Sequence, residues 1–379
     1  MVRTTVPLRR RLVRQWRWGV VLSGIALLVL LPSIVAAWPV DDPDIEVGTL
    51  LQRIDGSGAV PYEGLFESRG GVRVPDLGRY SDQVAVFTDS TRVRVWYAAA
   101  DRWRADELTP GGETGWYREP GGLWRWGTGR QRVVFATREG SEPARFPRPM
   151  DVSPAELGRR VVHDVLDDAD VRVTPIGARR IAGHVGAGVR FTPVDQATTT
   201  ITSIDVWAEA GSGLVLRVEI FAGSSVPIFE TGYLDLSFDT PAASVLSFDP
   251  DETGVPYRRS TTMDAIEVLA SIGFRMPDTL GGLNRRAGSS SGVQTYGSGL
   301  SIVSAFSVPR GVLGRRLTEL PSSTRPWGGE AIVIELDLVN VEIVEAAGFS
   351  YVLAGTVPVA VLDTMAGELT GEDGTETAG

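Results

Sequence analysis

The chain has 379 residues, 43% of them hydrophobic, which is enough for two domains of ordinary size. It contains no cysteine, so disulfides, thiolate metal sites and thiol nucleophiles are excluded. Six of its 37 basic residues and none of its 47 acids lie in the first 40 positions, which leaves a net charge of −16 on the remainder. An acidic body without a basic stripe repels nucleic acid, so we expect no nucleic-acid partner.

Residues 1–17 are a basic start, and residues 18–40 form an uncharged stretch about long enough to cross a bilayer. Arginines precede this stretch and acids follow it at 41–44, so we expect a cytoplasmic N-terminus and an extracytoplasmic body. Two interpretations stay open. Flanking tryptophans favour a retained signal anchor, whereas the small residues at 35–37 are typical of a signal peptide. The expected location is the cell membrane, as a single-pass protein, or the cell envelope if the chain is secreted and cleaved after Ala37.

Short alternating segments separated by turn residues follow a helix candidate at 45–54. The expected strands of this part are 62–68, 83–88, 91–97, 103–108, 114–118, 123–126 and 132–136. In the segment 91–97, Val93, Val95 and Tyr97 alternate with two arginines and a tryptophan, which places them on opposite faces of the strand. Regular short strands of this kind predict an antiparallel barrel or sandwich with an apolar face and an arginine-lined face.

A helix is expected at 153–166, with Ser153 as its N-cap, Pro154 at its first position and Glu156 completing a capping box. We expect this helix in the mouth of a curved sheet. The strands that follow are expected at 183–193, 201–209, 214–221 and 228–238.

The regular series of short strands ends near residue 250, and a mixture of helix and strand patterns follows. This change indicates a linker at 251–260 and a second domain at 261–369. The expected elements of this domain are a helix at 262–272, a strand pair at 293–308, a β-branched run at 331–345, a strand at 349–357 and a helix at 358–369. The run at 331–345 has two interpretations: an edge open to a partner segment, or a buried central strand pair. The acidic end, 370–379, is expected to be disordered.

A search for catalytic chemistry gives no candidate. The two histidines, His163 and His184, lie in an expected helix and an expected hairpin turn, and no metal-ligand spacing surrounds them. The GSSSG segment around Ser290 lacks the strand before it and the helix after it that a nucleophile elbow requires. We therefore expect no enzyme activity, no catalytic residue, no metal and no cofactor.

Five tryptophans crowd one short stretch and are the candidates for a ligand cavity. They are Trp96, Trp103, Trp116, Trp124 and Trp126. The alternative is that they fill the core beneath a wide sheet, and the sequence does not divide the five between these roles.

Several segments in order resemble the LolA/MucB/RseB superfamily, most closely its actinobacterial MucB/RseB-type branch. They are PYEGLFES, TRVRVWYAAADRWRADEL, GETGWYREPGGLWRW, RRIAGHVGAGVRFTPV and IDVWAEAGSGLVLRVEI. The resemblance covers residues 45–250, and the segments QTYGSGLSIVSAFSVP and SYVLAGTVPVAVLDTMAGEL resemble the smaller C-terminal domain of that branch. It implies a mainly β (α+β) protein: an unclosed antiparallel β half-barrel that covers helices, followed by a smaller α+β domain.

The resemblance also implies a function. Proteins of the MucB/RseB type sense envelope lipid or protein and bind the extracytoplasmic part of an anti-sigma factor. The expected partners are therefore an anti-sigma ectodomain, an acyl lipid or lipoprotein, and the membrane through the N-terminal segment. The expected function is non-enzymatic regulation of an extracytoplasmic-function sigma pathway, and the alternative is a lipid or lipoprotein carrier of the LolA type.

Overall fold

The computed structural model describes residues 40–71, 89–109, 111–129, 131–137, 145, 147–166, 168–260, 276–289, 292–310 and 320–371. Met1–Asp42 and Pro43–Gly379 form separate units. Four expected features therefore lie wholly or almost wholly outside the described residues: the segment 18–40, the strand 83–88, the helix 262–272 and the tail. Within the described ranges, no helix is long and apolar enough to span a membrane.

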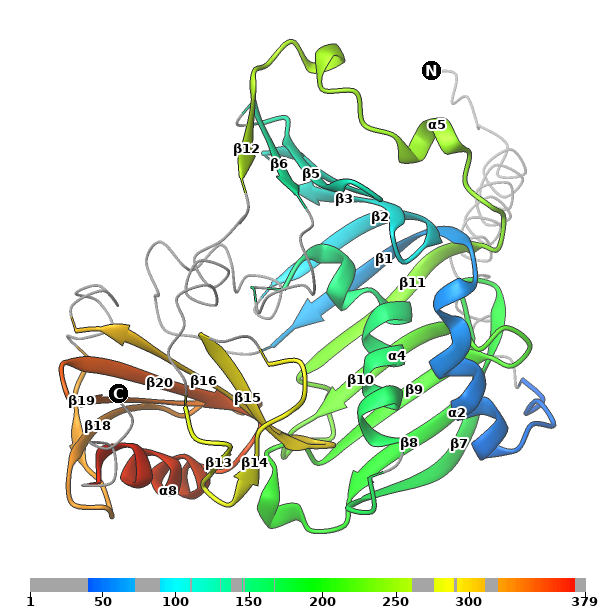
Figure 1. Ribbon diagram of the computed structural model, residues 1–379. Helices are drawn as coiled ribbons and strands as arrows, with labels where there is room; N and C mark the ends of the chain where they lie inside the picture. Colours follow the sequence, from blue (N-terminus) through cyan, green and yellow to red (C-terminus); the bar gives the residue numbers. More distant parts are fainter. Residues whose placement is uncertain are drawn as a thin grey trace, which may run out of the picture. The chain divides into compact units, whose positions relative to one another are not determined.

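Twelve strands form one large open sheet (Figure 1). They are β1 (Tyr62–Gly70), β2 (Ser90–Ala99), β3 (Arg102–Thr109), β4 (Gly112–Glu119), β5 (Gly122–Gly127), β6 (Arg132–Thr137), β7 (Val171–Ile181), β8 (His184–Pro193), β9 (Ser203–Glu209), β10 (Val215–Phe221), β11 (Phe229–Ser237) and β12 (Tyr257–Ser260). Their order is β12-β6-β5-β4-β3-β2-β1-β11-β10-β9-β8-β7, so β12 and β7 are unjoined edges and the sheet does not close into a barrel. All neighbours are antiparallel except β12 and β6. The expected mainly β, unclosed architecture is confirmed.

Two strands differ from the sequence-based expectation. Of β7, only its end lies in the segment RRIAGHVGAGVRFTPV, which predicts a strand pair. Pro175 and Gly177 interrupt the alternation of the rest; the structure accommodates them at an edge, next to a register shift between Ile176 and Arg179. The segment expected to be only a linker contains β12, which extends the sheet beside β6. Tyr257 of β12 stacks edge-on against Trp124, so this contact, and not local propensity, explains the strand.

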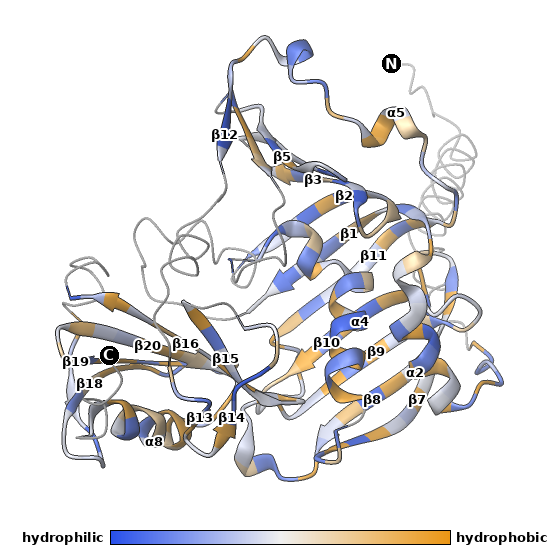
Figure 2. Cartoon of the chain, viewed as in Figure 1, coloured by the Kyte–Doolittle hydropathy of each residue, from blue (hydrophilic) through white to orange (hydrophobic). Residues whose placement is uncertain are grey.

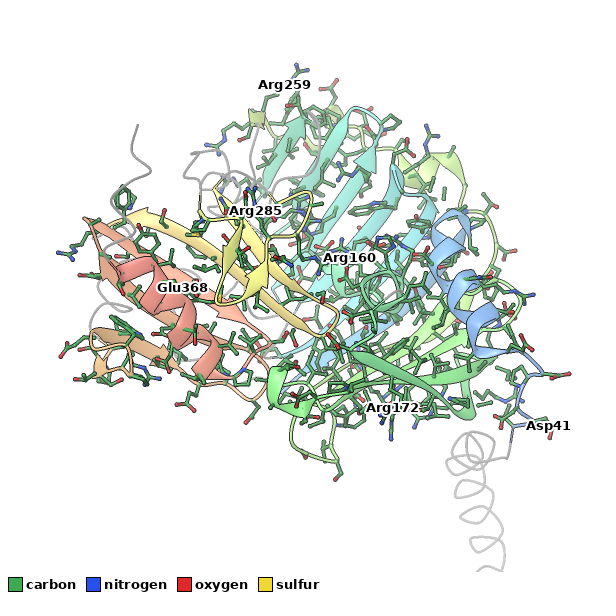
Figure 3. The ribbon with its side chains drawn as sticks, turned by 60° about the horizontal axis from the view of Figure 1, so that its bottom comes forward. Asp41, Arg160, Arg172, Arg259, Arg285 and Glu368 are labelled. Carbon is green, nitrogen blue, oxygen red and sulfur yellow. The ribbon has the colours of Figure 1, made fainter. Side chains whose placement is uncertain are left out.

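Two helices, α2 (Val47–Gly56) and α4 (Pro154–Val165), pack against one face of the sheet, which curves around them (Figure 1). We call this the inner face and the opposite one the outer face. Ser153 caps α4 as expected, since its Oγ accepts a hydrogen bond from the backbone N–H of Glu156 at 3.2 Å. The expected reciprocal half of the capping box is wrong: the Glu156 carboxylate binds Arg159 and Arg160 instead. Figure 3 labels Arg160 on this helix.

The C-terminal part forms a second, six-stranded sheet in the order β15-β16-β20-β19-β18-β17. Its strands are β15 (Val293–Ser298), β16 (Ser301–Pro309), β17 (Ser323–Thr324), β18 (Glu330–Ile334), β19 (Asn340–Ala346) and β20 (Phe349–Gly355). A short hairpin, β13 (Thr279–Leu280) and β14 (Leu283–Asn284), and the helix α8 (Val359–Thr370) complete it. Figure 2 shows hydrophobic residues along α8, and Figure 3 labels Glu368 on it.

The run at 331–345 is two strands and not one. β18 and β19 pair as an antiparallel hairpin, and β19 is central between β18 and β20. Among the described residues, β18 is flanked on its other side by the two-residue strand β17, which pairs with Glu330 and Ala331. The interpretation as a buried strand pair therefore holds for β19, whereas Ile332 to Ile334 lie at the sheet's edge.

Short elements complete the described chain. These are the helix α5 (Ala243–Leu246) and the 3-10 turns η1 (Ser57–Ala59), η3 (Pro149–Val152), η4 (Gln196–Thr198) and η5 (Asp251–Thr253). The residues after η4 bind the smaller sheet. The Thr199 hydroxyl contacts the carbonyl oxygens of Leu300 and Thr356 at 2.8 and 2.7 Å, and Leu300 joins a core cluster that contains Val162 of α4. The two-domain boundary stays a prediction, but the two sheets share buried contacts.

Candidate ligand site on the inner face of the large sheet

The inner face is apolar where β2, β1 and β11 lie side by side. Val93 of β2, Phe66 of β1 and Tyr233 of β11 are register partners, and all are buried. Side chains directly opposite each other in antiparallel strands share a face, so these three form one cross-strand row. Ala155 of α4 belongs to the same core cluster. The alternation in the sequence thus predicted which residues face the core.

A second row, two residues further along each strand, carries hydroxyl groups. Ser68 of β1 pairs with Thr91 of β2 on one side and with Thr231 of β11 on the other. Ser68 and Thr231 have no exposed surface, and Thr91 is 9% exposed. Val218 of β10 extends the row beyond Thr231. The row therefore places polar groups inside an otherwise apolar surface.

The hydroxyls of Ser68 and Thr231 have no hydrogen-bond partner in the part of the chain that the structure describes. A buried polar group without a partner costs about 1 to 3 kcal/mol relative to one that is bonded. Native proteins contain few such groups, and each one needs a physical explanation, such as an ordered water, an ion or a ligand. Two on adjacent strands of one row point to a missing partner.

Tyr62, Tyr233 and Trp116 add three more buried polar atoms to the same face. The Tyr62 and Tyr233 rings meet edge-on at 5.8 Å, and burial raises the pKa of both hydroxyls above the usual value of 10.0. The two hydroxyls interact with each other, and that of Tyr62 also interacts with Ser153. The Trp116 indole nitrogen has no hydrogen-bond partner among the described residues. All three side chains are more than nine-tenths buried. Ser68, Thr231 and Trp116 each carry a proton that they can donate, so the face suits a ligand with acceptor oxygens.

The five tryptophans expected to line a cavity divide between the two faces. Trp103 and Trp116 lie on the inner face, where they belong to the core cluster that contains Ala155. Trp124 lies on the outer face in a small cluster with Tyr117, and half-buried Trp126 packs against that cluster. Trp96 is the register partner of Arg104, which in turn pairs with Tyr117, so Trp96 also lies on the outer face.

The outer-face aromatics hold an arginine. The Arg104 guanidinium lies 4.7 Å from the Trp96 ring centroid and 4.8 Å from that of Tyr117, and it binds Asp106. Burial raises the pKa of Asp106 to about 6, against the opposing effect of Arg104. The contact with Arg104 accounts for Trp96, and packing in the Tyr117 cluster accounts for Trp124 and Trp126. Which tryptophans contact a ligand stays a prediction. Trp103 and Trp116 are the two that lie on the inner face, together with Ser68 and Thr231.

Ion pairs cross the rest of the outer face. Arg190 binds Asp205 through two hydrogen bonds of 2.6 Å between β8 and β9. Further pairs link β7, β10, β11, β1 and β2: Arg179–Glu219, Arg217–Glu219, Arg217–Glu230, Arg69–Glu230, Arg69–Glu67 and Arg92–Glu67. Because these charges are partnered within and between strands of the sheet, we assign them to the stability of the sheet.

The structure also places the remaining candidates. His163 Nδ1 lies 3.0 Å from Asp55 Oδ1, which connects α4 to α2 at the surface. His184 Nε2 lies 3.1 Å from the Leu236 carbonyl oxygen. Ser290 lies outside the described residues. Among the described residues, no three histidine or acidic side chains gather in a way that could hold a metal ion.

An open, curved antiparallel sheet with helices on its inner face, followed by a smaller sheet and helix, defines a class of half-barrel proteins. No protein-family model and no curated protein matches the sequence. Among solved structures, the chain is similar to the Pseudomonas aeruginosa MucA/MucB complex at 15% identity, over 84% of this chain and 96% of that one, with a TM-score of 0.47. It is also similar to LprF from Mycobacterium bovis at 12% identity, over 53% of this chain and 99% of that one, with a TM-score of 0.29.

A LolA-superfamily protein from Nitrosomonas europaea is similar at 10% identity, over 54% of this chain and 98% of that one, with a TM-score of 0.24. The likeness to these structures is one of fold alone. Membership of the actinobacterial branch stays a prediction. The polar groups of the inner face were missed by sequence reasoning, because a serine or threonine in an alternating strand gives no sign of whether its hydroxyl is bonded.

Proposed function

We propose that the chain is an extracytoplasmic, membrane-associated, non-enzymatic binding protein that senses an acyl lipid or lipoprotein and regulates an extracytoplasmic-function sigma/anti-sigma pathway. The observation that carries the binding step is the set of buried donors on the inner face that have no partner among the described residues: Ser68, Trp116 and Thr231. An amphiphile has acceptor oxygens that can bond to these donors. It also has apolar surface that packs well against the rest of the inner face.

The location is part of the proposal and is supported by the sequence. Arginines precede the uncharged stretch at 18–40, and acids follow it. A body anchored to the membrane can contact membrane lipids and the extracytoplasmic parts of other membrane proteins directly. It does not need to diffuse through the envelope to reach them.

The regulatory step is supported by the second sheet. A carrier needs only the half-barrel, whereas here Thr199, Thr200 and Leu300 join the smaller sheet to the large one through buried contacts. A ligand on the inner face and a protein partner on the smaller sheet can influence each other only if the two parts are coupled. Shared core residues provide such a connection.

The test is ligand-dependent capture of the ectodomain of a membrane-bound anti-sigma factor from the same organism. The full-length protein is immobilised, and the dissociation constant of the ectodomain is measured with and without a short-chain acyl phospholipid. We expect a change of about 5-fold or more, the usual lower range of allosteric coupling. If the ectodomain does not bind under either condition, the regulatory proposal fails.

The alternative function is a lipid or lipoprotein carrier of the LolA type, which uses the same inner face. A carrier should move a fluorescent acyl lipid between two vesicle populations faster than spontaneous exchange. Lipid transfer without any effect on ectodomain capture would favour the carrier over the regulator.

A further inference from the structure

Ser68 and Thr231 form a pair in the middle of the inner face. They sit directly opposite each other on β1 and β11, with Thr91 of β2 beyond Ser68. Opposite residues in antiparallel strands have Cα atoms about 4.5 to 5.5 Å apart, so both hydroxyls can reach one oxygen atom placed between them. Both are wholly buried, and neither has a partner among the described residues.

The surroundings of the pair are apolar. Phe66 and Val93 occupy the row on one side, and Phe229 pairs with Gly70 on the other side. Alanine in place of Ser68 and valine in place of Thr231 would fill the same space without burying an unbonded hydroxyl. For the stability of the folded protein alone, the two hydroxyls are therefore less favourable than apolar side chains. The pair is explained if a bound molecule accepts its hydrogen bonds.

A carbonyl oxygen meets both requirements. It has two lone pairs, one for each hydroxyl, and it carries no charge that burial would penalise. An ester-linked acyl chain combines this oxygen with a long apolar body that suits Phe66 and Val93. A charged head group in the same place would be far more expensive to bury.

We propose that Ser68 and Thr231 are the subsite for a carbonyl oxygen of an ester-linked acyl ligand. This proposal rests on the proposed function, which it makes more specific: the ligand is recognised by its ester linkage as well as by its hydrocarbon. Thr91 and Val218 border the subsite along the row.

The test compares two probes that differ only in the linkage: dihexanoyl phosphatidylglycerol and its dialkyl ether analogue, both kept below their micelle concentrations. The full-length protein, held in an amphipol, is titrated with each. The wild type should bind the diester about tenfold more tightly than the diether, the value of one good hydrogen bond. The double variant Ser68→Ala with Thr231→Val should bind both probes alike, at the wild-type affinity for the diether.

Two further variants complete the experiment. Thr231→Ser retains a hydroxyl and should keep the preference for the diester. Thr192→Val makes the same chemical change on β8 and should leave both affinities unchanged, because Thr192 pairs with Arg172 on the outer face. The melting temperature of the double variant should equal or exceed that of the wild type, since no internal hydrogen bond is lost.

The outcomes separate the two proposals. Equal affinity of the wild type for both probes, or a preference that survives in the double variant, overturns the carbonyl subsite and leaves acyl binding intact; the pair would then hold water. Failure of the wild type to bind either probe overturns acyl binding itself. A marked fall in the melting temperature of the double variant would show that the hydroxyls have a structural partner, and would also overturn the subsite.

Discussion

Glu342 on β19 is wholly buried in the smaller sheet, next to a second acid. Trp327 donates a hydrogen bond to its Oε1 at 3.4 Å, and its Oε2 has no partner among the described residues. Asp363 of α8 is held by two hydrogen bonds from Arg325, of 2.7 and 2.8 Å. Burial raises the pKa of Glu342 to about 7, and the negative charge of Asp363 adds to the effect.

A raised pKa in the folded state makes stability fall as pH rises. The folded protein holds a proton on Glu342 up to about pH 7, whereas the unfolded chain releases it near the ordinary value of 4.5. The contribution of Glu342 is therefore complete below pH 4.5 and is lost as pH rises through 7. At about 1.4 kcal/mol per pKa unit, the loss is on the order of 3 kcal/mol.

We predict that Glu342→Gln removes most of this dependence. Glutamine has the same shape and stays neutral, so the variant should match the wild type at pH 5 and be more stable than it at pH 8. Urea unfolding at both values measures the difference. The control is Glu345→Gln, the exposed acid three residues later, which should behave as the wild type does. An unchanged slope in Glu342→Gln would show that the carboxyl is ionised in the folded protein.

Among the elements, those whose patterns are local were predictable, and those that depend on distant partners were not. The N-cap at Ser153 and the alternation of β2 are set by residues close in sequence, and both are confirmed. β12 forms because β6 and the Trp124 cluster lie beside it, which no local pattern reveals. The run at 331–345 leaves the position of its turn open, because the turn at 335–339 contains apolar residues as well as acids.

Helix α4 approaches the sheet closely at Gly158. A Cβ at this position would lie 2.6 Å from Cγ1 of Val215 on β10, a distance that real contacts do not reach. Valine is stiff about its first torsion, so the helix or the strand would have to move.

We predict that Gly158→Ala destabilises the protein by about 1 to 2 kcal/mol, because overpacking outweighs the gain in helix propensity. Gly48→Ala on α2 is the matched control, since nothing lies within 4 Å of its added Cβ. That variant should be neutral or up to about 1 kcal/mol more stable. Thermal unfolding of both variants measures this. Equal effects would mean that α4 does not pack on β10 at this distance.

At the scale of the whole molecule, the loop after η4 connects the two sheets. Besides the bonds of Thr199, the hydroxyl of Thr200 donates to the Leu338 carbonyl oxygen at 2.5 Å, and Arg286 forms an ion pair with Asp164 of α4. Leu300 and Leu338 bury their side chains in the cluster beneath α4. The smaller sheet therefore completes part of the core of the larger one.

We predict that Thr199→Val costs about 1 to 3 kcal/mol, because the hydrogen bonds of its hydroxyl to the Leu300 and Thr356 carbonyl oxygens are lost and the Ile201 N–H loses its acceptor. Thr192→Val, on the outer face of β8, should change stability by less than about 0.5 kcal/mol. Chemical denaturation followed by far-UV circular dichroism gives both values. If the two variants were equally stable, the bonds of Thr199 would not hold the sheets together, and the smaller sheet would be a separable module.

The sequence predicted the class of fold more completely than the site. Period-two alternation and turn residues are enough to indicate an antiparallel sheet, and the resemblance of the ordered segments implied that the sheet is open. The tryptophans are candidates from sequence because they are large apolar groups. The strand register places Trp96 and Trp124 on the outer face, where they lie next to Arg104 and Tyr117. Small hydroxyl residues such as Ser68 became candidates only when burial and missing partners were known.

The central claim is that the inner face of the large sheet binds an acyl ligand. Its most direct test is photolabelling of the full-length protein with an acyl phospholipid that carries a diazirine in its chain, followed by mass spectrometry of the labelled peptides. Labels should map to β1, β2 and β11, on inner-face residues such as Phe66, Val93 and Tyr233, and an excess of unlabelled lipid should compete them away. Labels confined to outer-face residues such as Trp96, or labelling that unlabelled lipid does not reduce, would contradict the claim.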